Sequence, residues 1–340
     1  MLSRKAQTET KIYIMKKNLF SLASILAVLN ANAIEIGPTG SGVELGGFVD
    51  YSAVSQGDTT SPVSTAQVEL NLDFSSGPVS FSLDYDLTAT QGLDSDGDND
   101  VDTDDTTSGN LEEAVLTYTI SDSLSVSVGR MLSYLGFEAY DAPNMYQFSY
   151  AYDYATEGGQ DIYDGYADGL SVDYATDMFS IGVWTDFAEK PSFEYAFAFT
   201  GITNLTAKAI FADYGGDADD IMTLWASYQL DKLLLAVEFA SDEKNAGAPG
   251  TLADFSDDDI DAFMIMGNYS VTDSFAITAR YSQAEYTDGT TSVDVDKFTI
   301  SPSYSFTDNF SGLIEYSTYD VTAGNAEPDD LTAIELIYTF

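Results

Sequence analysis

Apolar and polar residues alternate along most of the chain. In residues 66–74, which read AQVELNLDF, the apolar side chains occupy every second position and the polar side chains the positions between. A period of two places the two sets on opposite faces of a β-strand. The pattern predicts sixteen strands, at residues 43–54, 64–75, 79–90, 111–121, 123–131, 167–175, 178–189, 191–201, 204–214, 220–230, 232–242, 259–270, 274–286, 294–305, 309–320 and 331–340.

The connections between these strands alternate in length. Short polar turns such as 121–122 and 230–231 alternate with long connections such as 91–110, 132–166 and 243–258. Short turns at one end and long loops at the other are typical of an outer-membrane β-barrel, and an even strand number brings both chain ends to the short-turn side. The predicted fold class is therefore all-β, a transmembrane antiparallel β-barrel of about sixteen strands with short periplasmic turns and long extracellular loops.

A secreted β-sandwich or soluble barrel is the alternative, because it also has alternating strands. Sixteen apolar faces would then have to enclose one very large dry core. A membrane barrel instead turns its apolar face to lipid and its polar face to a wet lumen. The last strand also favours this fold, because its outward residues include Tyr338 and Phe340. This ending resembles the C-terminal signature of bacterial outer-membrane barrels that the barrel-assembly machinery reads.

The N-terminal region has the three parts of a secretory signal peptide. Met15 is followed by two lysines, an apolar run covers residues 19–29, and Ala31-Asn32-Ala33 forms an A-x-A cleavage pattern. The sequence predicts a signal peptide over residues 1–33 with the true start at Met15. The mature chain, 34–340, is expected to be a single barrel domain, and no apolar stretch of helix-spanning length follows the signal.

Composition narrows the functions. The chain has 56 acidic and 12 basic residues among 340, with no Cys and no His. A chain so poor in Lys and Arg is not expected to bind nucleic acid. The missing His and Cys exclude Ser-His and Cys-His catalysis and disulfides. The outer-membrane lipase and protease families that offer a comparison use a catalytic His, so no enzyme activity is predicted.

Residues 128–144, which read VGRMLSYLGFEAYDAPN, resemble a segment of outer-membrane β-barrel porins. In that family a strand ending in Gly-Lys leads to a Gly-aromatic-Glu stretch and then to Ser-Tyr, here Ser149-Tyr150; Arg130 replaces the Lys. The whole mature chain is similar in architecture to general bacterial porins. That resemblance implies sixteen strands, a homotrimer, and a loop after the fifth strand that folds into the lumen.

The longest connection, 132–166, also follows the fifth predicted strand. The sequence therefore suggests a constriction loop, although a loop that stays outside is the alternative. Its acidic residues and the nearby inward cations are the candidate pore-lining set: Arg130, Glu138, Asp141, Asp153, Glu157, Asp161, Asp164, Arg280 and Lys297. Arg130 fits poorly, because simple alternation would aim it at lipid unless a bulge or snorkelling intervenes.

Strand parity places thirteen carboxylates but only four basic residues, Lys208, Lys232, Arg280 and Lys297, on the inner face. Carboxylates in a pore favour cations. The simpler interpretation is that acidic residues only keep wet surfaces solvated, and the two interpretations are compatible. Tyrosines at 146–166 suggest stacking surfaces for a sugar or, alternatively, ordinary aromatic packing.

The connection at 94–105 carries carboxylates at alternate positions. Asp94, Asp96, Asp98, Asp100 and Asp105 resemble an Asp-rich calcium loop, with Asn99 where an EF-hand has Gly and Asp where it has Glu. A specific Ca²⁺ site and a merely solvated acidic loop both remain open. No other cofactor is required.

Two functions follow for a protein of the cell outer membrane. The first is a porin, a water-filled channel for passive diffusion of small hydrophilic solutes that prefers cations. The alternative is a structural or adhesive barrel whose acidic loops face partners or cations between lipopolysaccharide molecules. The expected surroundings are outer-membrane lipid and lipopolysaccharide in both cases.

Overall fold

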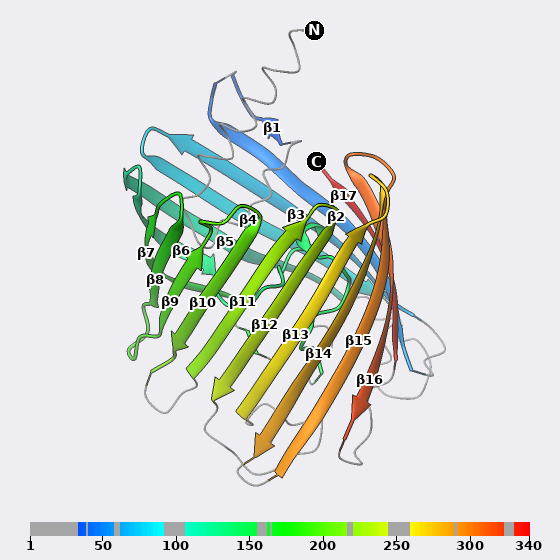
Figure 1. The fold of residues 1–340 in the computed structure, drawn as a ribbon. Coiled ribbons are helices and arrows are strands. Elements are labelled where there is room, and N and C mark those ends of the chain that lie inside the picture. The colour runs from blue at the N-terminus through cyan, green and yellow to red at the C-terminus, as the bar shows by residue number, and fades with distance from the viewer. Residues whose placement is uncertain are drawn as a thin grey trace.

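Sixteen long strands of the computed structural model follow one another around a closed ring (Figure 1). Each pairs antiparallel with the next along the chain, and β17 pairs with β2 to close the barrel. The structure describes residues 33–38, 40–57, 62–91, 106–154, 162–163, 165–215, 220–243, 259–288, 291–322 and 330–340. Apart from residue 33, the predicted signal peptide lies outside these residues, as do Met15 and the predicted Ca²⁺ loop, residues 94–105.

All sixteen predicted strands are present, most of them within two residues of the predicted ends. The strands of the ring are β2 (Val43–Gln56), β3 (Val63–Ser76), β4 (Val79–Gln91), β5 (Thr106–Ser121), β6 (Leu124–Leu132), β7 (Tyr166–Ala175), β8 (Phe179–Asp186), β9 (Phe193–Phe199), β10 (Leu205–Asp213), β11 (Asp220–Leu230), β12 (Leu233–Glu243), β13 (Asp259–Ser270), β14 (Phe275–Asp288), β15 (Thr291–Ser305), β16 (Phe310–Val321) and β17 (Leu331–Thr339). A two-residue strand, β1 (Ile34–Glu35), extends the edge of β2. A 3₁₀ turn, η2 (Ala142–Asn144), lies between β6 and β7.

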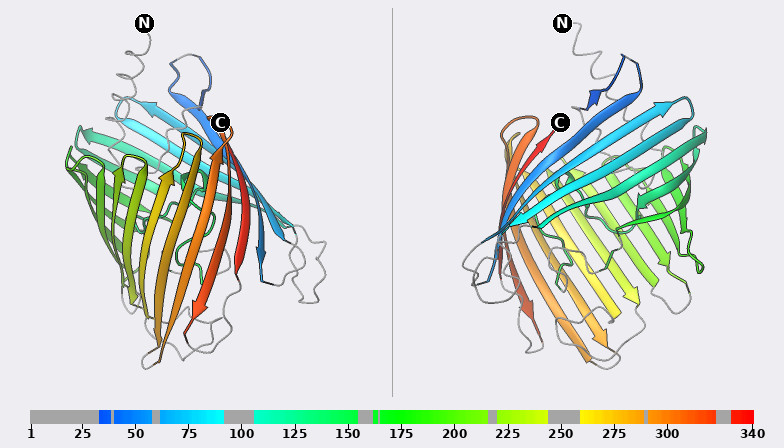
Figure 2. Two further views of the ribbon diagram at one scale, coloured as in Figure 1. Left: turned by 45° about the vertical axis from the view of Figure 1, so that its right-hand side comes forward. Right: turned by 180° about the vertical axis from the view of Figure 1, so that it is seen from behind.

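The C-terminal strand closes the ring. Tyr338 lies opposite Val49 in β2, and Gly47 and Phe340 exchange two backbone hydrogen bonds of 3.1 and 3.0 Å. Gly47 has a φ of +154°, and a Cβ at this position would lie 3.1 Å from the Phe340 ring and overlap the Glu69 carbonyl. Both the C-terminus and β1 lie at the end of the barrel that carries the short turns (Figures 1 and 2).

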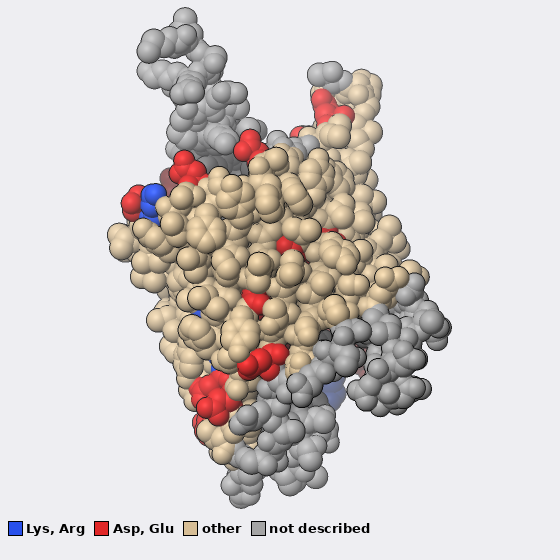
Figure 3. All heavy atoms as spheres, turned by 90° about the vertical axis from the view of Figure 1, so that its right-hand side faces the viewer, with Lys and Arg blue, Asp and Glu red and all other residues tan. Residues whose placement is uncertain are grey.

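Burial alternates along the strands, as a barrel in lipid requires. In β13, Met264 and Met266 are buried toward the interior, while Phe263 and Ile265 between them are exposed on the outside. Large apolar side chains are exposed in the same way on most strands. The face seen in Figure 3 is mostly uncharged, and most of its Asp and Glu lie toward its upper and lower ends. None of the helices in the described part of the chain has the length and apolar character needed to cross a membrane.

The inner face is not uniformly polar, which differs from the predicted wet lumen. A buried apolar cluster includes Ile210, Ala240 and Met264 from the strands together with Tyr152 and Tyr163 from the segment between β6 and β7. The interior of the barrel thus contains a hydrophobic core on one side. That core forms because a connecting segment packs inside the ring.

Candidate functional site in the barrel lumen

The described residues of the segment between β6 and β7, namely 133–154, 162–163 and 165, are here called the inward loop and lie inside the barrel (Figures 1 and 2). Its backbone is held by the carboxylate of Glu315 on β16. The N–H groups of Phe148 and Ser149 donate to Glu315 Oε2 over 2.7 and 3.1 Å, and the Ser149 hydroxyl donates to Oε1. The Glu315 carboxylate therefore accepts the hydrogen bonds that these loop N–H groups would otherwise donate to water.

Two cations on β14 and β15 hold the same stretch of loop. Arg280 donates to the carbonyls of Ser149 and Tyr150 over 2.7 and 2.8 Å and forms an ion pair with Glu138. Lys297 donates to the Tyr150 carbonyl over 2.8 Å and to Asp153 over 2.6 Å. Arg280 and Lys297 are each only 1% exposed. Their charges are therefore compensated by the loop and by Glu315.

Further contacts attach the inward loop on both sides of this cluster. Tyr134 donates from its N–H to Glu194 on β9 over 2.8 Å and from its hydroxyl to Asp173 on β7 over 2.9 Å. Burial and the neighbouring Asp173 charge raise the pKa of Tyr134 well above its usual value. The Tyr154 hydroxyl donates to Ser282 on β14 over 3.1 Å. The loop is thus tied to several separate strands.

Aromatic packing covers the rest of this side. Phe137 lies edge-on to Trp225 of β11 with ring centroids 5.4 Å apart, and Lys208 of β10 lies 5.2 Å from the same indole. Tyr152 and Tyr163 pack against each other at 6.0 Å. For these tyrosines aromatic packing is confirmed. We call the inner faces of β9–β16, with the loop upon them, the loop-covered wall.

The opposite inner face, formed by β17 and β2–β5, carries carboxylates in neighbouring strands. We call this face the acidic wall, and its row of five carboxylates the acidic stripe: Glu335, Asp50, Glu69, Asp86 and Glu112. Four of them are between 3% and 6% exposed, and Glu112 is half-buried. Among the described residues, no Lys or Arg nitrogen forms a salt bridge with any of the five.

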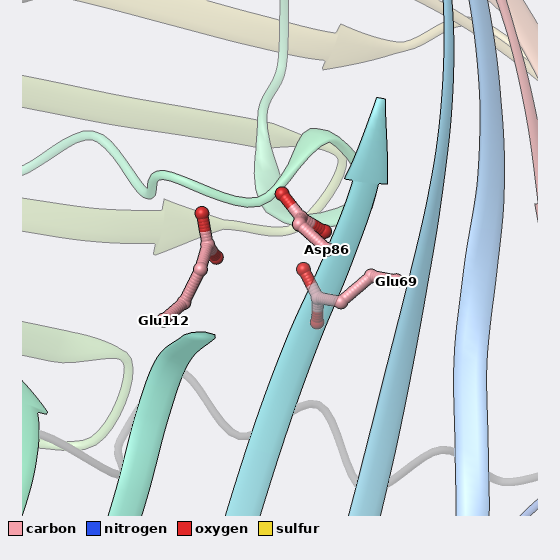
Figure 4. A group of neighbouring side chains, drawn as sticks. All are labelled: Glu69, Asp86 and Glu112. Atoms are coloured by element: carbon pink, nitrogen blue, oxygen red, sulfur yellow. The ribbon is translucent and has the colours of Figure 1, made fainter. Parts of the chain in front are cut away.

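Within the stripe, Glu69, Asp86 and Glu112 each offer one carboxylate oxygen, and these oxygens lie within 4.8 Å of one another (Figure 4). Amide side chains and the Tyr166 hydroxyl donate to this group, and Asp86 and Glu112 share a side-chain hydrogen bond. Gln67 donates to Asp86 over 2.6 Å, and Asn71 donates to Glu69 over 2.5 Å. One oxygen of Glu69 and one of Asp86 are buried without a hydrogen-bond partner.

A β-bulge explains why Glu112 belongs to this group. Glu113 lies opposite Asp84, and Leu111 lies opposite Tyr85, so Glu112 is an extra residue in β5. A bulge re-aims the side chain of the inserted residue. Strict alternation would send Glu112 to the lipid face, which is why the sequence pattern did not identify it. Two adjacent glutamates inside an alternating strand were the available signal.

The inward loop reaches the acidic wall at Asp141, which precedes η2. Burial and the charges of Asp84 and Asp86 raise the pKa of Asp141 to about 6, although Asn144 donates to its carboxylate. The loop therefore meets cations on one wall and carboxylates on the other.

The structure brings Glu138, Asp153, Arg280 and Lys297 together and places Asp141 across from them. Arg130 is a correction to the predicted pore-lining set. It lies on the same outward face of β6 as the exposed Val128, pairs with the exposed Asp168 at 3.8 Å and donates to the Leu111 carbonyl at 2.9 Å. Ser127 and Met131 point to the inner face of β6, so Arg130 belongs to the set of positions that points outward.

Eight of the predicted site residues belong to parts of the chain that the structure does not describe. Glu157, Asp161 and Asp164 lie outside the described residues, as do Asp94, Asp96, Asp98, Asp100 and Asp105 of the predicted Ca²⁺ loop. Lys232 is exposed in the turn between β11 and β12. The inward cations of the described strands are therefore Lys208, Arg280 and Lys297, all on the loop-covered wall.

A closed sixteen-stranded barrel with an apolar outer face and a loop inside its lumen defines a protein of the porin class. The family model described as "Putative beta-barrel porin-2, OmpL-like" matches residues 49–340, which is most of the chain. The protein belongs to this family of outer-membrane porins, and its location is the outer membrane. A comparison with curated protein sequences finds no match.

Solved porin structures share the fold. Salmonella typhi OmpF in complex with daunomycin superposes with a TM-score of 0.64 at 14% identity, over 91% of this chain and 100% of the other. Outer-membrane expressed OmpT of Vibrio cholerae gives 0.62 at 13% identity over 90% and 100% of the two chains. A mutant of the Rh. blastica porin gives 0.57 at 15% over 88% and 100%.

Proposed function

We propose that this porin is a water-filled, cation-preferring channel for passive diffusion of small hydrophilic solutes, and that it is not an enzyme. The observation that carries the proposal is the uneven distribution of charge inside the barrel. The inward cations Lys208, Arg280 and Lys297 are buried on the loop-covered wall, whereas the acidic stripe has no salt-bridge partner among the described residues. A solute in the lumen therefore meets a surface whose net charge is negative.

Such a surface selects by charge. Rings or rows of carboxylates favour cations in pores. Screening in a narrow lumen is incomplete, because the Debye length is about 8–10 Å at physiological salt. K⁺ is expected to enter more readily than Cl⁻. The inward loop is proposed to narrow the lumen, which limits permeation to small solutes.

The test is a reversal potential measured across a planar bilayer under a KCl gradient. At neutral pH and low salt, its sign is expected to be that of a channel in which K⁺ passes faster than Cl⁻. The preference is expected to weaken as salt rises and as pH falls toward about 4, where carboxylates protonate. A potential near zero, or one of the opposite sign, would contradict the cation preference.

The alternative, a structural or adhesive barrel, is supported by the extent of packing between the inward loop and β9–β16. Conductance separates the two functions. A folded, heat-modifiable barrel that inserts into bilayers and does not conduct favours the structural function.

A homotrimer is the proposed assembly. A structure of in-vitro folded OmpT of Vibrio cholerae is described as a trimer form, and it has a TM-score of 0.60 to this chain at 15% identity, over 88% of this chain and 99% of that chain. Cross-linking in outer membranes is expected to yield a species of three copies. Cross-linking that yields only one copy would contradict the trimer.

A further inference from the structure

The acidic stripe contains one place where three carboxylates converge on a single point. Glu69, Asp86 and Glu112 come from three adjacent strands, and their nearest oxygens lie within 4.8 Å of one another (Figure 4). Carboxylates at this distance repel one another when ionised, and the repulsion is stronger where water is excluded. Some positive charge, either protons or a metal ion, must compensate them.

Two oxygens in the group lack any hydrogen-bond partner although they are buried. They are Glu69 Oε2 and Asp86 Oδ1, from side chains of residues only 3% and 6% exposed. A buried polar atom without a partner costs about 1–3 kcal/mol, and a charged one costs more. In Figure 4 the carboxylate of Glu69 points toward that of Asp86, and Glu112 faces both. A cation at the centre of the group would satisfy both oxygens.

The spacing identifies the class of cation. Oxygens that bind one Ca²⁺ at about 2.3–2.6 Å lie at most about 5 Å apart, which admits the observed spread. Mg²⁺ binds at about 2.0–2.1 Å, so its ligands lie at most about 4.2 Å apart, and the group would have to contract. Hard carboxylate oxygens are also the ligands that Ca²⁺ prefers over softer sites.

We propose that Glu69, Asp86 and Glu112 form a Ca²⁺ site on the lumen face of β3–β5. Water completes the coordination of the ion, which normally takes six to eight oxygens. Asp141 of the inward loop is near enough to Asp84 and Asp86 for their charges to act on it. A Ca²⁺ ion on the acidic wall would therefore attract this part of the loop and bridge it toward β3–β5.

The site would also regulate the proposed channel. A bound Ca²⁺ removes two negative charges from the acidic stripe, so the preference for K⁺ over Cl⁻ falls when Ca²⁺ is present. This consequence rests on the proposed function. The binding site itself does not, because binding is measured on the folded barrel without any conductance.

The experiment is a ⁴⁵Ca²⁺ equilibrium-dialysis titration of the purified full-length barrel in detergent, together with its thermal unfolding with and without Ca²⁺. Glu69→Gln removes a ligand, and Asp73→Asn is the matched control. Asp73 lies on the same strand and inner face as Glu69 but outside the group, where it accepts from Ser82 over 2.9 Å. The control therefore loses the same charge and none of the three ligands.

Wild type and Asp73→Asn are expected to bind with similar affinity and to unfold at a higher temperature in Ca²⁺. Glu69→Gln is expected to bind at least about tenfold more weakly and to lose most of that shift. If Glu69→Gln does not give a heat-modifiable barrel, Glu112→Gln replaces it, because Glu112 is half-buried in a bulge.

A triple variant of the predicted Ca²⁺ loop, Asp94→Asn with Asp96→Asn and Asp98→Asn, distinguishes binding at the proposed site from binding at that loop. If the proposal is right, this variant still binds Ca²⁺ with the wild-type affinity and still unfolds at a higher temperature in Ca²⁺. Equal binding by Glu69→Gln and wild type, or a site lost only in the triple variant, overturns the proposal. A barrel that binds Ca²⁺ in this way but does not conduct would leave the site standing and overturn only the channel function.

Discussion

The loop-covered wall and the acidic wall are parts of one sheet with the same alternating strands, yet they treat charge in opposite ways. On the loop-covered wall, Arg280 and Lys297 meet Glu138, Asp153 and backbone carbonyls of the inward loop. On the acidic wall, the five carboxylates of the stripe meet amides and one another. The polar groups of the loop-covered wall bind the inward loop. The carboxylates of the acidic wall face the lumen.

The difference shows that the net charge of a pore cannot be obtained by counting inward residues. A cation that is buried and paired contributes little to the field in the lumen, because its partner cancels most of it. A carboxylate without a basic partner adds its charge to that field whenever it is ionised. The uneven pairing therefore concentrates the uncompensated negative charge on the acidic wall.

The largest effect is expected from removing the cation that fixes the loop. Arg280→Met leaves Glu138 without its buried partner and removes one of the two cations near Glu315, and breaking a buried ion pair by removing one side costs about 3–5 kcal/mol. We expect a barrel with a lower unfolding temperature and a larger, noisier single-channel conductance, measured by heat-modifiable mobility and planar-bilayer recording.

The matched control is Arg130→Met, since that arginine forms a single exposed pair at 3.8 Å on the outside of the barrel. Exposed pairs contribute about 0–1 kcal/mol, so conductance and unfolding should change little. If the two variants behave alike, Arg280 does not hold the inward loop.

A smaller effect is expected from neutralising two members of the stripe. Asp50→Asn with Glu335→Gln removes two charges that have no basic partner. One charge acting over about 10 Å of water changes the energy of an ion by about 0.4 kcal/mol, so the K⁺/Cl⁻ permeability ratio should fall at least about twofold. Reversal potentials at low salt measure this ratio.

Glu194→Gln is the control for the comparison between the walls. Glu194 is 3% exposed and accepts the N–H of Tyr134 beneath the inward loop. Its neutralisation should change the ratio less than either single change in the stripe. A larger change at Glu194 would mean that the loop-covered wall controls selectivity.

The last effect, which depends on pH, is expected at Asp141, where the loop meets the acidic wall. The pKa of this carboxyl is raised from 3.8 to about 6, so the folded barrel holds its proton more tightly than the unfolded chain does. Stability therefore falls as pH rises through the interval between these two values. Asp141→Asn should stabilise the barrel by at most about 3 kcal/mol above pH 6 and have little effect below pH 4.

Thermal unfolding at pH 3.5 and pH 7.5 tests this expectation, with Asp168→Asn as the control. Asp168 is an exposed aspartate on the outside of β7. If Asp141→Asn raises the unfolding temperature equally at both pH values, the charge of Asp141 is not what destabilises the folded barrel.

Family resemblance predicts a loop inside the lumen, but no local sequence pattern predicts which strand residues bind that loop. Arg280, Lys297 and Glu315 lie more than 120 residues beyond the loop segment they hold. Strict alternation points Glu112 outward, and the inserted residue in β5 turns it to the lumen. Arg130 lies within the resembling segment, but alternation already points it outward, as the structure shows.

The sequence by itself determined the strands and their number, because a period of two is a local property that the backbone imposes on every strand in lipid. It also determined the apolar outer face and the excess of acid, since both are sums over positions. Only the tertiary structure decided which charges are cancelled. Pairing depends on where a long loop comes to rest inside the ring and on a bulge in β5, and both are set by contacts between residues far apart in the chain. For that reason the acidic stripe and the covered cations became distinguishable only once the barrel had closed around its loop.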